Sequence, residues 1–579
     1  MSNNKKIIVT ALILCLAVIA TLSACKGKMA GGTESVVVTD ANGVPITDKN
    51  GEAMTVMLQT TIVEITNING EKVYDEDGKV KTSIKYLPQD VGVPVTNEKG
   101  EFVTNSKGDI ETTMITIPPT AGSPVTSNVP LTDSNGEVIT DKDGNQITYP
   151  MVSSTNPATP GDNNANWGAT FGGSGNDEFI DTASLSDGGF ISIVKSNSSD
   201  GSLKGLVGDN VMPVMVIIKY NKDCQMQWQK VIGGDSGILF SSLCVDLEDN
   251  IFAVGYSQSK NLGFTNQGDY DGLIYKFNNK GDVQWVKNFG GTKTDTFESI
   301  ALAPDGDVVV VGFTNSPDGN AEHLALSKGE STPILLKFSP DGTQKYVKSI
   351  GSSGDTLVDV TVAENGDIYA VGNFSSATNK SILKTKGRSD CGIIKLDKDA
   401  NVKWVQQYGG SDIDSANSIT LGIGGGCVIA GKTKSTDGDL KEIGNQGGYD
   451  AFITKYNDDG SLGWRNVFRG SFDEEFTEIK TSGSQYTLSG FSLSGNRNFK
   501  PLGNRGGTDA FLVNFGETGR PTSVQSYGGN SDDKFKSFCI LKSGQTIACG
   551  STLSKDGDLI GSKVQSDGIN TVGMIARFK

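Results

Sequence analysis

Histidine and the common catalytic motifs are almost absent from this sequence. His323 is the one histidine among 579 residues, and no G-x-S-x-G, H-E-x-x-H or phosphate-binding loop occurs. General-base chemistry through histidine would therefore depend on a single side chain. Carboxylates could act instead, as an acid pair does in many glycosidases, but acids are spread through the chain and no pair stands out. We predict no catalytic residues.

Positive charge is scarce as well. Lysine and arginine number 51 against 67 aspartates and glutamates, which gives a formal net charge of -16. Binding to a nucleic-acid backbone needs clusters of lysine and arginine, because the phosphates are anionic. The composition therefore argues against a nucleic-acid partner and predicts an acidic, soluble surface.

Cysteines with the spacing of metal ligands are absent. The eight cysteines include no C-x-x-C pair and have no neighbouring histidine, so no zinc site is indicated. We predict no cofactor and no metal site, with calcium at the D-G-D sequences of residues 437–439 and 556–558 as the alternative. Cys539 and Cys549 lie on adjacent strands of one expected hairpin, and they either form a disulfide or stay as buried thiols.

Long apolar runs are confined to the N-terminus. The run from Ile7 to Leu22 follows two lysines and is short for a bilayer span, which is typical of a secretory signal. The sequence L-S-A-C that ends at Cys25 resembles the lipobox of bacterial lipoproteins. That resemblance implies a signal peptide over 1–24, lipidation of Cys25, a tether over 25–32, and an exported protein held at the membrane on its extracytoplasmic face or at the cell surface.

The segment from 33 to 152 is poor in apolar residues. It contains glycine pairs eight residues apart, in frames such as D-S-N-G and D-K-D-G that favour tight turns. Such a segment buries too little apolar surface for a sizeable core, so we expect a stalk of short β-hairpins or extended chain. Residues 153–165, rich in Pro, Asn and Gly, are predicted to be a linker. The glycine pairs are Gly43/Gly51, Gly70/Gly78, Gly100/Gly108 and Gly136/Gly144.

A repeat of 57 to 61 residues fills the rest of the chain. Its landmark is an aromatic residue or isoleucine followed by Gly-Gly or a near variant. A fixed period of this length, with four strand-like pieces in each copy, predicts an all-β fold, a seven-bladed β-propeller over 166–579. The seven landmarks are Phe171, Ile232, Phe289, Ile350, Tyr408, Phe468 and Tyr527.

Tryptophan follows the same register. Each of the five tryptophans lies four residues before a landmark, and Tyr346 and Ser523 occupy the other two positions. One position repeated in five blades predicts packing between blades rather than a sugar-binding platform. The chain also starts with one strand of this type and ends with Val572 to Lys579, so we expect the first strand to complete the last blade and close the ring. The tryptophans are Trp167, Trp228, Trp285, Trp404 and Trp464.

The stretch Tyr449 to Trp464, Y-D-A-F-I-T-K-Y-N-D-D-G-S-L-G-W, followed by G-x-x-x-acid, is similar to the SBBP-type β-propeller repeats of bacterial extracellular proteins. The resemblance covers about residues 167–579 and implies an architecture but no single activity. The crossover is the segment that follows each landmark and leads into the next repeat. Six of the seven crossovers contain an acidic residue, which we expect to form a turn or a cap, and in the second crossover Ile238 replaces it. Those acids are Asp177, Asp295, Asp355, Asp414, Glu474 and Asp533.

Each of the seven repeats has one long loop after its second strand, on the same face as the Gly-Gly crossovers. Because they differ between copies on a rigid scaffold, we expect binding there, although none of their residues stands out individually. Side chains of interest in them are Phe264, His323, Arg388, Arg497, Phe499 and Arg505.

These features predict a lipid-anchored, surface-exposed propeller that binds an extracellular protein or glycan through its long-loop face. The alternatives are a hydrolase or lyase acting on extracellular glycans, and a scaffold for envelope assembly. The sequence leaves the oligomeric state open.

Overall fold

The computed structural model describes residues 167–579 with their side chains, except 207–212, 234–235, 261–263, 265, 325–330, 352–353, 376–382, 384, 442, 444, 446, 501, 561 and 563–565. Before residue 167 it describes only the backbone of strands. Cys25, the signal peptide and the linker at 154–164 lie outside the described residues. Predictions about them, and the predicted domain boundaries, therefore stay predictions.

The chain divides into two compact units, and the N-terminal one contains short antiparallel strands. In it β1, β2 and β3 form one sheet, and β4 pairs with β5. The strands before the propeller are β1 (Gly32–Val37), β2 (Thr55–Glu64), β3 (Thr82–Tyr86), β4 (Gln89–Pro94), β5 (Thr112–Ile117), β6 (Ser127–Pro130) and β7 (Thr148–Ser153).

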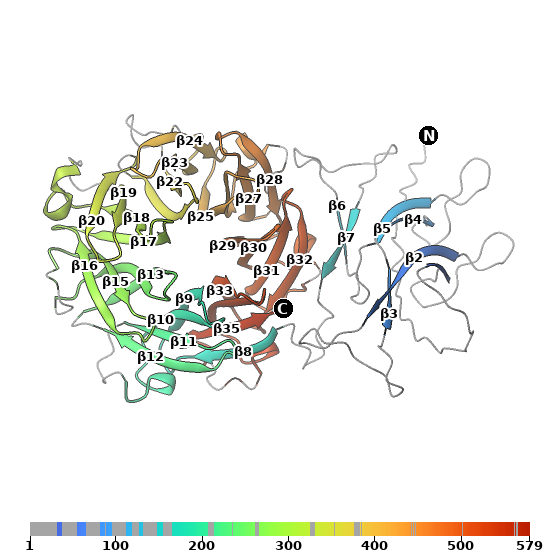
Figure 1. Ribbon diagram of the computed structural model, residues 1–579, viewed down its shortest axis with the longest axis horizontal. Coiled ribbons are helices and arrows are strands. Elements are labelled where there is room, and N and C mark those ends of the chain that lie inside the picture. Colours follow the sequence, from blue (N-terminus) through green and yellow to red (C-terminus); the bar gives the residue numbers. More distant parts are fainter. Residues whose placement is uncertain are drawn as a thin grey trace. The chain divides into compact units, whose positions relative to one another are not determined.

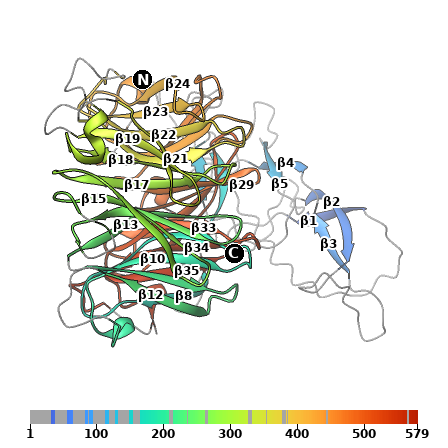
Figure 2. The ribbon, with the colours of Figure 1, turned by 60° about the vertical axis from the view of Figure 1, so that its left-hand side comes forward.

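The second unit is a seven-bladed β-propeller, as predicted (Figures 1 and 2). In each blade four antiparallel strands run from the central axis outward. Blade 1 contains β9 (Asp177–Ser184), β10 (Phe190–Ser196), β11 (Val214–Tyr220) and β12 (Met226–Ile232). Blade 2 contains β13 (Ile238–Val245), β14 (Ile251–Ser257), β15 (Asp271–Phe277) and β16 (Val283–Phe289). Blade 3 contains β17 (Asp295–Leu302), β18 (Val308–Thr314), β19 (Thr332–Phe338) and β20 (Gln344–Ser349).

The remaining blades repeat this order. Blade 4 contains β21 (Thr356–Val362), β22 (Ile368–Phe374), β23 (Asp390–Leu396) and β24 (Val402–Tyr408). Blade 5 contains β25 (Asp414–Leu421), β26 (Cys427–Thr433), β27 (Asp450–Tyr456) and β28 (Leu462–Phe468). Blade 6 contains β29 (Glu474–Ser482), β30 (Gln485–Ser492), β31 (Asp509–Gly516) and β32 (Pro521–Tyr527). Blade 7 contains β33 (Asp533–Ile540), β34 (Thr546–Thr552), β35 (Val572–Phe578) and, as its outermost strand, β8 (Ala165–Phe171).

The pairing of β8 with β35 confirms the predicted ring closure. The two strands are antiparallel, with Phe171 opposite Gly573 and Trp167 opposite Arg577. Phe171 and Trp167 also pack against blade 1, because their rings contact Phe179 and Phe190 at centroid distances of 6.1 and 6.5 Å. One short strand therefore joins the last blade to the first.

The second and third strands of each blade are buried on both faces, because neighbouring blades cover them. In β14 and β15, for example, five consecutive residues are buried in each strand. This explains their continuous apolar runs, which a sheet with one solvated face would not tolerate. In the described part of the chain no helix is long and apolar enough to cross a membrane.

The tryptophans pack between blades, as predicted. Trp404, at the outer edge of blade 4, donates its indole N–H to the Asp458 carbonyl in the next blade at 3.0 Å. Its ring lies against Gly460, where an added Cβ would be 3.1 Å from a ring carbon and where φ is +84°. Glycine meets both demands, a close approach and a left-handed backbone. The same contact joins Trp228, Trp285 and Trp464 to Gly281, Gly342 and Gly519.

Replacing Trp404 by alanine should lower the free energy of unfolding by about 2–4 kcal/mol, because a half-buried indole and its hydrogen bond are lost. The matched control is Ser523→Ala, at the equivalent position of blade 6, with an expected change below about 1 kcal/mol. Denaturant melts of the two variants measure the difference. Equal losses would show that the tryptophan position does not carry the contact between blades.

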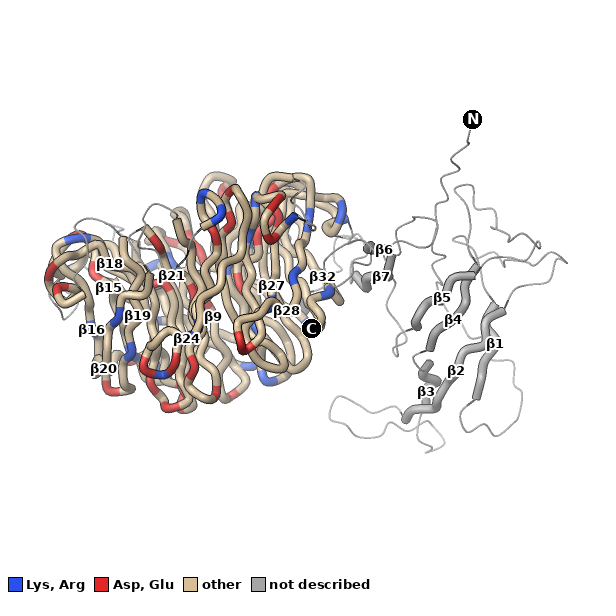
Figure 3. The backbone as a smooth tube through the Cα atoms, turned by 90° about the horizontal axis from the view of Figure 1, so that it is seen from above, with Lys and Arg blue, Asp and Glu red and all other residues tan. Residues whose placement is uncertain are grey.

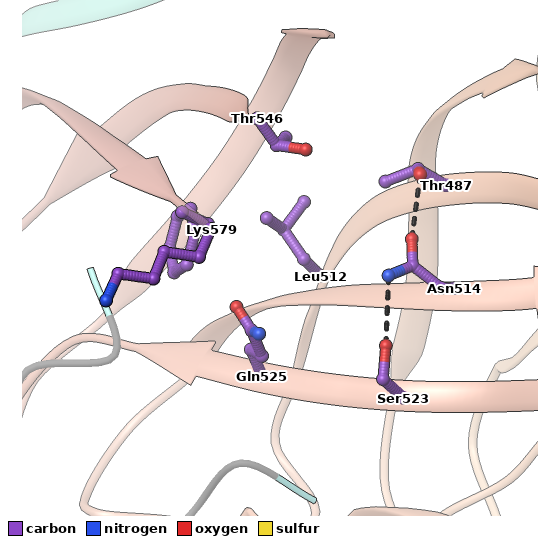
Figure 4. A pocket seen from close by; sticks show the side chains of 8 residues that line it. Thr487, Leu512, Asn514, Ser523, Gln525, Thr546 and Lys579 are labelled. Carbon is purple, nitrogen blue, oxygen red and sulfur yellow. Dashed lines mark hydrogen bonds between the residues drawn. The ribbon is translucent and has the colours of Figure 1, made fainter. Parts of the chain in front are cut away.

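Blade 6 has Ser523 in place of a tryptophan, and a small cleft of about 20 Å³ is found at its junction with blade 7. Figure 4 shows Asn514 between Thr487 and Ser523, to which it is linked by hydrogen bonds of 2.7 and 2.9 Å. Short polar side chains thus replace the tryptophan and the two residues in register with it, which are Lys395 and Tyr369 in blade 4. The cleft is too small for anything larger than a water molecule.

The six cysteines of the propeller are free thiols, and five of them are buried. Cys539 lies opposite Ile547 and Cys549 opposite Ser537, so the hairpin register sets the two thiols apart. Of the two alternatives for Cys539 and Cys549, a disulfide or two buried thiols, the structure shows two buried thiols. Burial raises the pKa of both groups above the ordinary thiol range.

Candidate functional site

The acids that follow the Gly-Gly landmarks cap turns, as predicted. Asp295 is fully buried and accepts hydrogen bonds from the Gly291 N–H at 2.9 Å, the Ser316 hydroxyl at 2.7 Å and the Thr314 hydroxyl. It therefore ties the crossover to the start of the long loop. Asp177, Asp414 and Asp533 make the same three contacts in their own blades.

The long loops are less variable than expected, because their first residues repeat a structure. In the described parts of the loops, five contain a short 3-10 helix that buries a side chain in the blade, such as Leu440 or Phe499. The first turn of each of these five loops is therefore part of the scaffold, and the expected variation between blades begins only after it. The helices are η1 (Gly201–Leu203), η2 (Gly319–Leu324), η3 (Gly438–Leu440), η4 (Arg497–Phe499) and η5 (Gly557–Leu559).

The two D-G-D sequences belong to this scaffold. Asp437 Oδ1 accepts the Ser411 N–H at 2.7 Å, and Asp439 Oδ2 accepts the Gly409 N–H at 3.0 Å and pairs with Lys386. In the second sequence Asp558 pairs with Arg505 at 2.7 Å. These oxygens already face N–H donors, and no group of three metal-ligating side chains occurs among the described residues.

The six side chains of interest divide into two groups. Phe264, Phe499 and Arg505 are structural: Phe264 packs on the core of blade 2, Phe499 is fully buried, and Arg505 donates to the Gly528 carbonyl at 2.9 Å as well as to Asp558. His323, Arg388 and Arg497 are exposed. The structure does not bring these three together, since they belong to loops of blades 3, 4 and 6.

A cavity of about 390 Å³ lies on the axis of the ring, and no pattern in the sequence predicted it. A β-bulge in the innermost strand of every blade turns one extra side chain into it. Apart from Lys195 and Tyr256 of the second strands, its lining residues come from the first five residues of these innermost strands, on the side of the crossovers and long loops. The bulged residues are Ile180, Ser241, Glu298, Val358, Asn417, Thr477 and Lys536.

The residues that follow the bulges form a belt that links the blades. Asp359 of blade 4 accepts hydrogen bonds from Ser299 of blade 3 at 2.6 Å and from Ser418 of blade 5 at 2.8 Å. Asp181 of blade 1 does the same for Ser242 of blade 2 and Ser537 of blade 7. These carboxylates hold the ring together. Their oxygens are already paired, so we assign them a structural role.

A second set of residues lies beside the cavity. In the second strand of six blades the residue before the last one is half-buried between two buried neighbours, and two of these residues, Lys195 and Tyr256, line the cavity. We call it the rim position. Comparing the seven strands residue by residue would have revealed it. Its occupants are Lys195, Tyr256, Phe313, Asn373, Lys432, Phe491 and, buried in blade 7, Ser551.

Rim residues reach across to the next blade. Lys432 of blade 5 pairs with Glu475 of blade 6 at 2.9 Å, and the ammonium of Lys534 in blade 7 lies 4.7 Å from the ring centre of Phe491 in blade 6. Glu298 lies in the cavity, where burial raises the pKa of its carboxyl group. The mouth thus combines aromatic, basic and acidic groups, a mixture suited to binding a polar macromolecule. Acidic and basic residues are interspersed along both edges of the ring (Figure 3).

Buried carboxylates meet where neighbouring blades join. An added Cβ on Gly290 would lie 2.5 Å from Asp271 Oδ1 and 2.7 Å from Asp295 Oδ2, so the two acids converge below this glycine. Burial, together with the neighbouring acid, raises the pKa of Asp509 to about 7 and of Glu474 to about 8. Asp271, Asp390, Asp509 and Glu474 each keep one buried oxygen without a hydrogen-bond partner.

Comparisons with known proteins assign no family and no function to this chain. No protein-family model matches the chain. A curated relative, the regulatory protein FlaEY of Caulobacter vibrioides, is 23% identical over 254 residues, which cover 42% of this chain and 26% of that protein. Similar solved structures include the Pan2 WD40 domain of Neurospora crassa (7% identity, TM-score 0.37, covering 70% of this chain and 97% of that one) and YCF48 bound to D1 peptide (10% identity, TM-score 0.38, covering 73% and 99%).

Proposed function

We propose that this chain is an exported protein, anchored by a lipid on Cys25, whose propeller binds an extracellular protein or glycan through the long-loop face. The observation that carries the proposal is the rim position. Five residue types occupy this position in the seven blades, and two of its side chains, Lys195 and Tyr256, line the axial cavity, inside a frame that otherwise repeats. A rigid ring that presents varied side chains at one mouth is suited to binding.

The N-terminal sequence supports the anchor. Replacing Cys25 by alanine should move the protein from the membrane fraction to the medium or periplasm, because no acyl chain could be attached. Fractionation of cells with an antibody against the propeller measures this. The matched control is Cys224→Ala, which removes a buried propeller thiol and should leave the protein on membranes. Retention of the Cys25→Ala protein on membranes would refute the lipid anchor.

The first alternative is a glycan-active hydrolase or lyase, and the cavity gives it some support. Glu298, Glu475 and Glu178 line the cavity, and the raised pKa of Glu298 is a property of general acids. A screen of polysaccharides with substoichiometric full-length protein separates the two functions. A binding module retains ligand without products. More than one product molecule per protein would establish turnover and contradict the proposal.

The second alternative is a scaffold for envelope assembly. It shares the binding face with the leading proposal and differs in the partner, which would be an envelope protein. Crosslinking in intact cells followed by identification of the crosslinked partner decides between them. An extracellular protein or glycan supports the leading proposal, and an assembling membrane protein supports the scaffold.

A further inference from the structure

The crossover between blades 5 and 6 departs from the repeat at two positions. Arg469 replaces the first glycine of the Gly-Gly landmark, and Phe472 occupies a position that is glycine or polar in every other crossover. Phe472 is 59% exposed, although a phenyl group in water is unfavourable. The corresponding residues are Gly175, Ser236, Lys293, Gly354, Asp412 and Ser531.

Phe472 lies between two other segments of the long-loop face. The Gly448 N–H donates to the Phe472 carbonyl at 3.0 Å on one side, and the Leu493 N–H donates to the Asp473 carbonyl at 3.1 Å on the other. Leu493 is 39% exposed. Tyr449, which follows Gly448, donates its N–H to Asp473 at 2.9 Å. Tyr449, Phe472 and Leu493 therefore come from three adjacent segments and share one surface.

Two lysines border this surface. The ammonium groups of Lys432 and Lys434 lie 5.2 and 5.6 Å from the ring centre of Tyr449. Lys432 is also paired with Glu475 at the rim, whereas Lys434 is exposed. We call Lys432, Lys434, Tyr449, Phe472 and Leu493 the blade 5–6 patch. It presents exposed apolar side chains next to a cation and continues to the rim of the cavity.

We propose that the blade 5–6 patch binds an extended segment of a partner protein that carries apolar side chains beside a carboxylate. This inference rests on the proposed function and names the partner class for the same face. The partner's apolar side chains cover Phe472 and Leu493, and its carboxylate pairs with Lys434. Exposed apolar groups with a charged border are typical of protein interfaces.

The same residues favour a protein over the other occupants. A sugar could stack on the exposed ring of Phe472, but the ring of Tyr449 is already engaged by two ammonium groups and Leu493 has no aromatic face, so the rest of the patch offers a sugar no free ring. An anionic membrane surface attracts clusters of lysine and arginine. This chain has a net charge of -16, and exposed Asp473 lies inside the patch. Charge repulsion therefore disfavours a lipid surface.

The test uses the full chain and a random dodecamer peptide library displayed on phage. We expect enrichment of peptides that combine apolar and acidic residues. A synthetic peptide of the enriched sequence should bind Phe472→Ser and Leu493→Ser proteins about tenfold more weakly or worse. Leu247→Ser is the matched control, because Leu247 is 93% exposed in a hairpin turn on the opposite face, and its affinity should be unchanged. Equal melting temperatures establish that all variants fold.

Charge reversal provides a second arm. The Lys434→Glu variant should bind the acidic peptide more weakly. A peptide with lysine in place of the acidic residue should bind that variant with the affinity restored. Equal affinity of the enriched peptides for the Phe472→Ser protein and the parent protein would overturn the inference. A failure to enrich any peptide would overturn it as well. A ligand found on a glycan array, or binding to phosphatidylglycerol vesicles, that is lost in Phe472→Ser would overturn it too. None of these outcomes would contradict the proposed function if crosslinks in cells still come from the long-loop face.

Discussion

Deleting residues 166–173 is expected to abolish the cooperative unfolding transition of the whole propeller. The deletion removes β8, and with it the outermost strand of blade 7 and the rings of Trp167 and Phe171 that pack against blade 1. In a closed ring each blade is covered by two neighbours, so opening one junction exposes apolar surface on both sides of the gap. Calorimetry of the full chain with and without these residues measures the effect.

The control for this deletion is removal of residues 154–164, a segment of similar length that precedes β8 in the sequence. That variant should melt at the temperature of the parent protein. If the 166–173 deletion also left the transition unchanged, β8 would not close the ring, and the link between the last and first blades would have to be sought elsewhere.

Raising the pH from 5 to 9 is expected to destabilise the propeller by several kcal/mol. The pKa of Glu474 is raised from 4.5 to about 8, that of Asp509 from 3.8 to about 7, and that of Asp533 from 3.8 to about 6. A carboxyl group with a raised pKa in the folded state stabilises that state while it stays protonated. The contribution is complete below about pH 4 and is lost as the pH rises through 6 to 8. Each unit of pKa shift corresponds to about 1.4 kcal/mol.

Two substitutions test the origin of this pH dependence. Glu474→Gln and Asp509→Asn replace a buried acid by a neutral side chain of the same size, so each should flatten the fall in stability between pH 6 and 9. Glu248→Gln, at an exposed turn position, should leave the profile of the parent unchanged. Denaturant melts at five or six pH values provide the measurement. A profile that stays as steep in both buried variants would show that these acids are not its source.

The period of the repeat was sufficient to predict the number of blades, the ring closure and the packing role of the tryptophans. Each of these depends on contacts that recur in every copy, so the repeat displays them several times. Trp404 and Gly460 illustrate this, because an indole in one blade needs a glycine turn in the next. The capping role of Asp295 followed from its fixed place after Gly-Gly.

The binding face was predicted less well. The long loops were expected to differ between blades, but buried Phe499 and Leu440 show that the first turns of their loops belong to the scaffold. The axial cavity depends on β-bulges and on the convergence of seven strands, neither of which has a sequence signature. Phe472 was visible as a departure from the repeat, but its exposure becomes evident only when the neighbouring segments are placed around it.

The most direct test of the central claim is a comparison of crosslinking from the two faces of the ring in intact cells. A photoreactive amino acid is introduced at Lys434, on the long-loop face, and in parallel at Leu247, in a hairpin turn on the opposite face. We predict that a partner is crosslinked from position 434 and that little or none is crosslinked from position 247. Equal crosslinking from both positions, or crosslinking from 247 alone, would contradict the assignment of binding to the long-loop face.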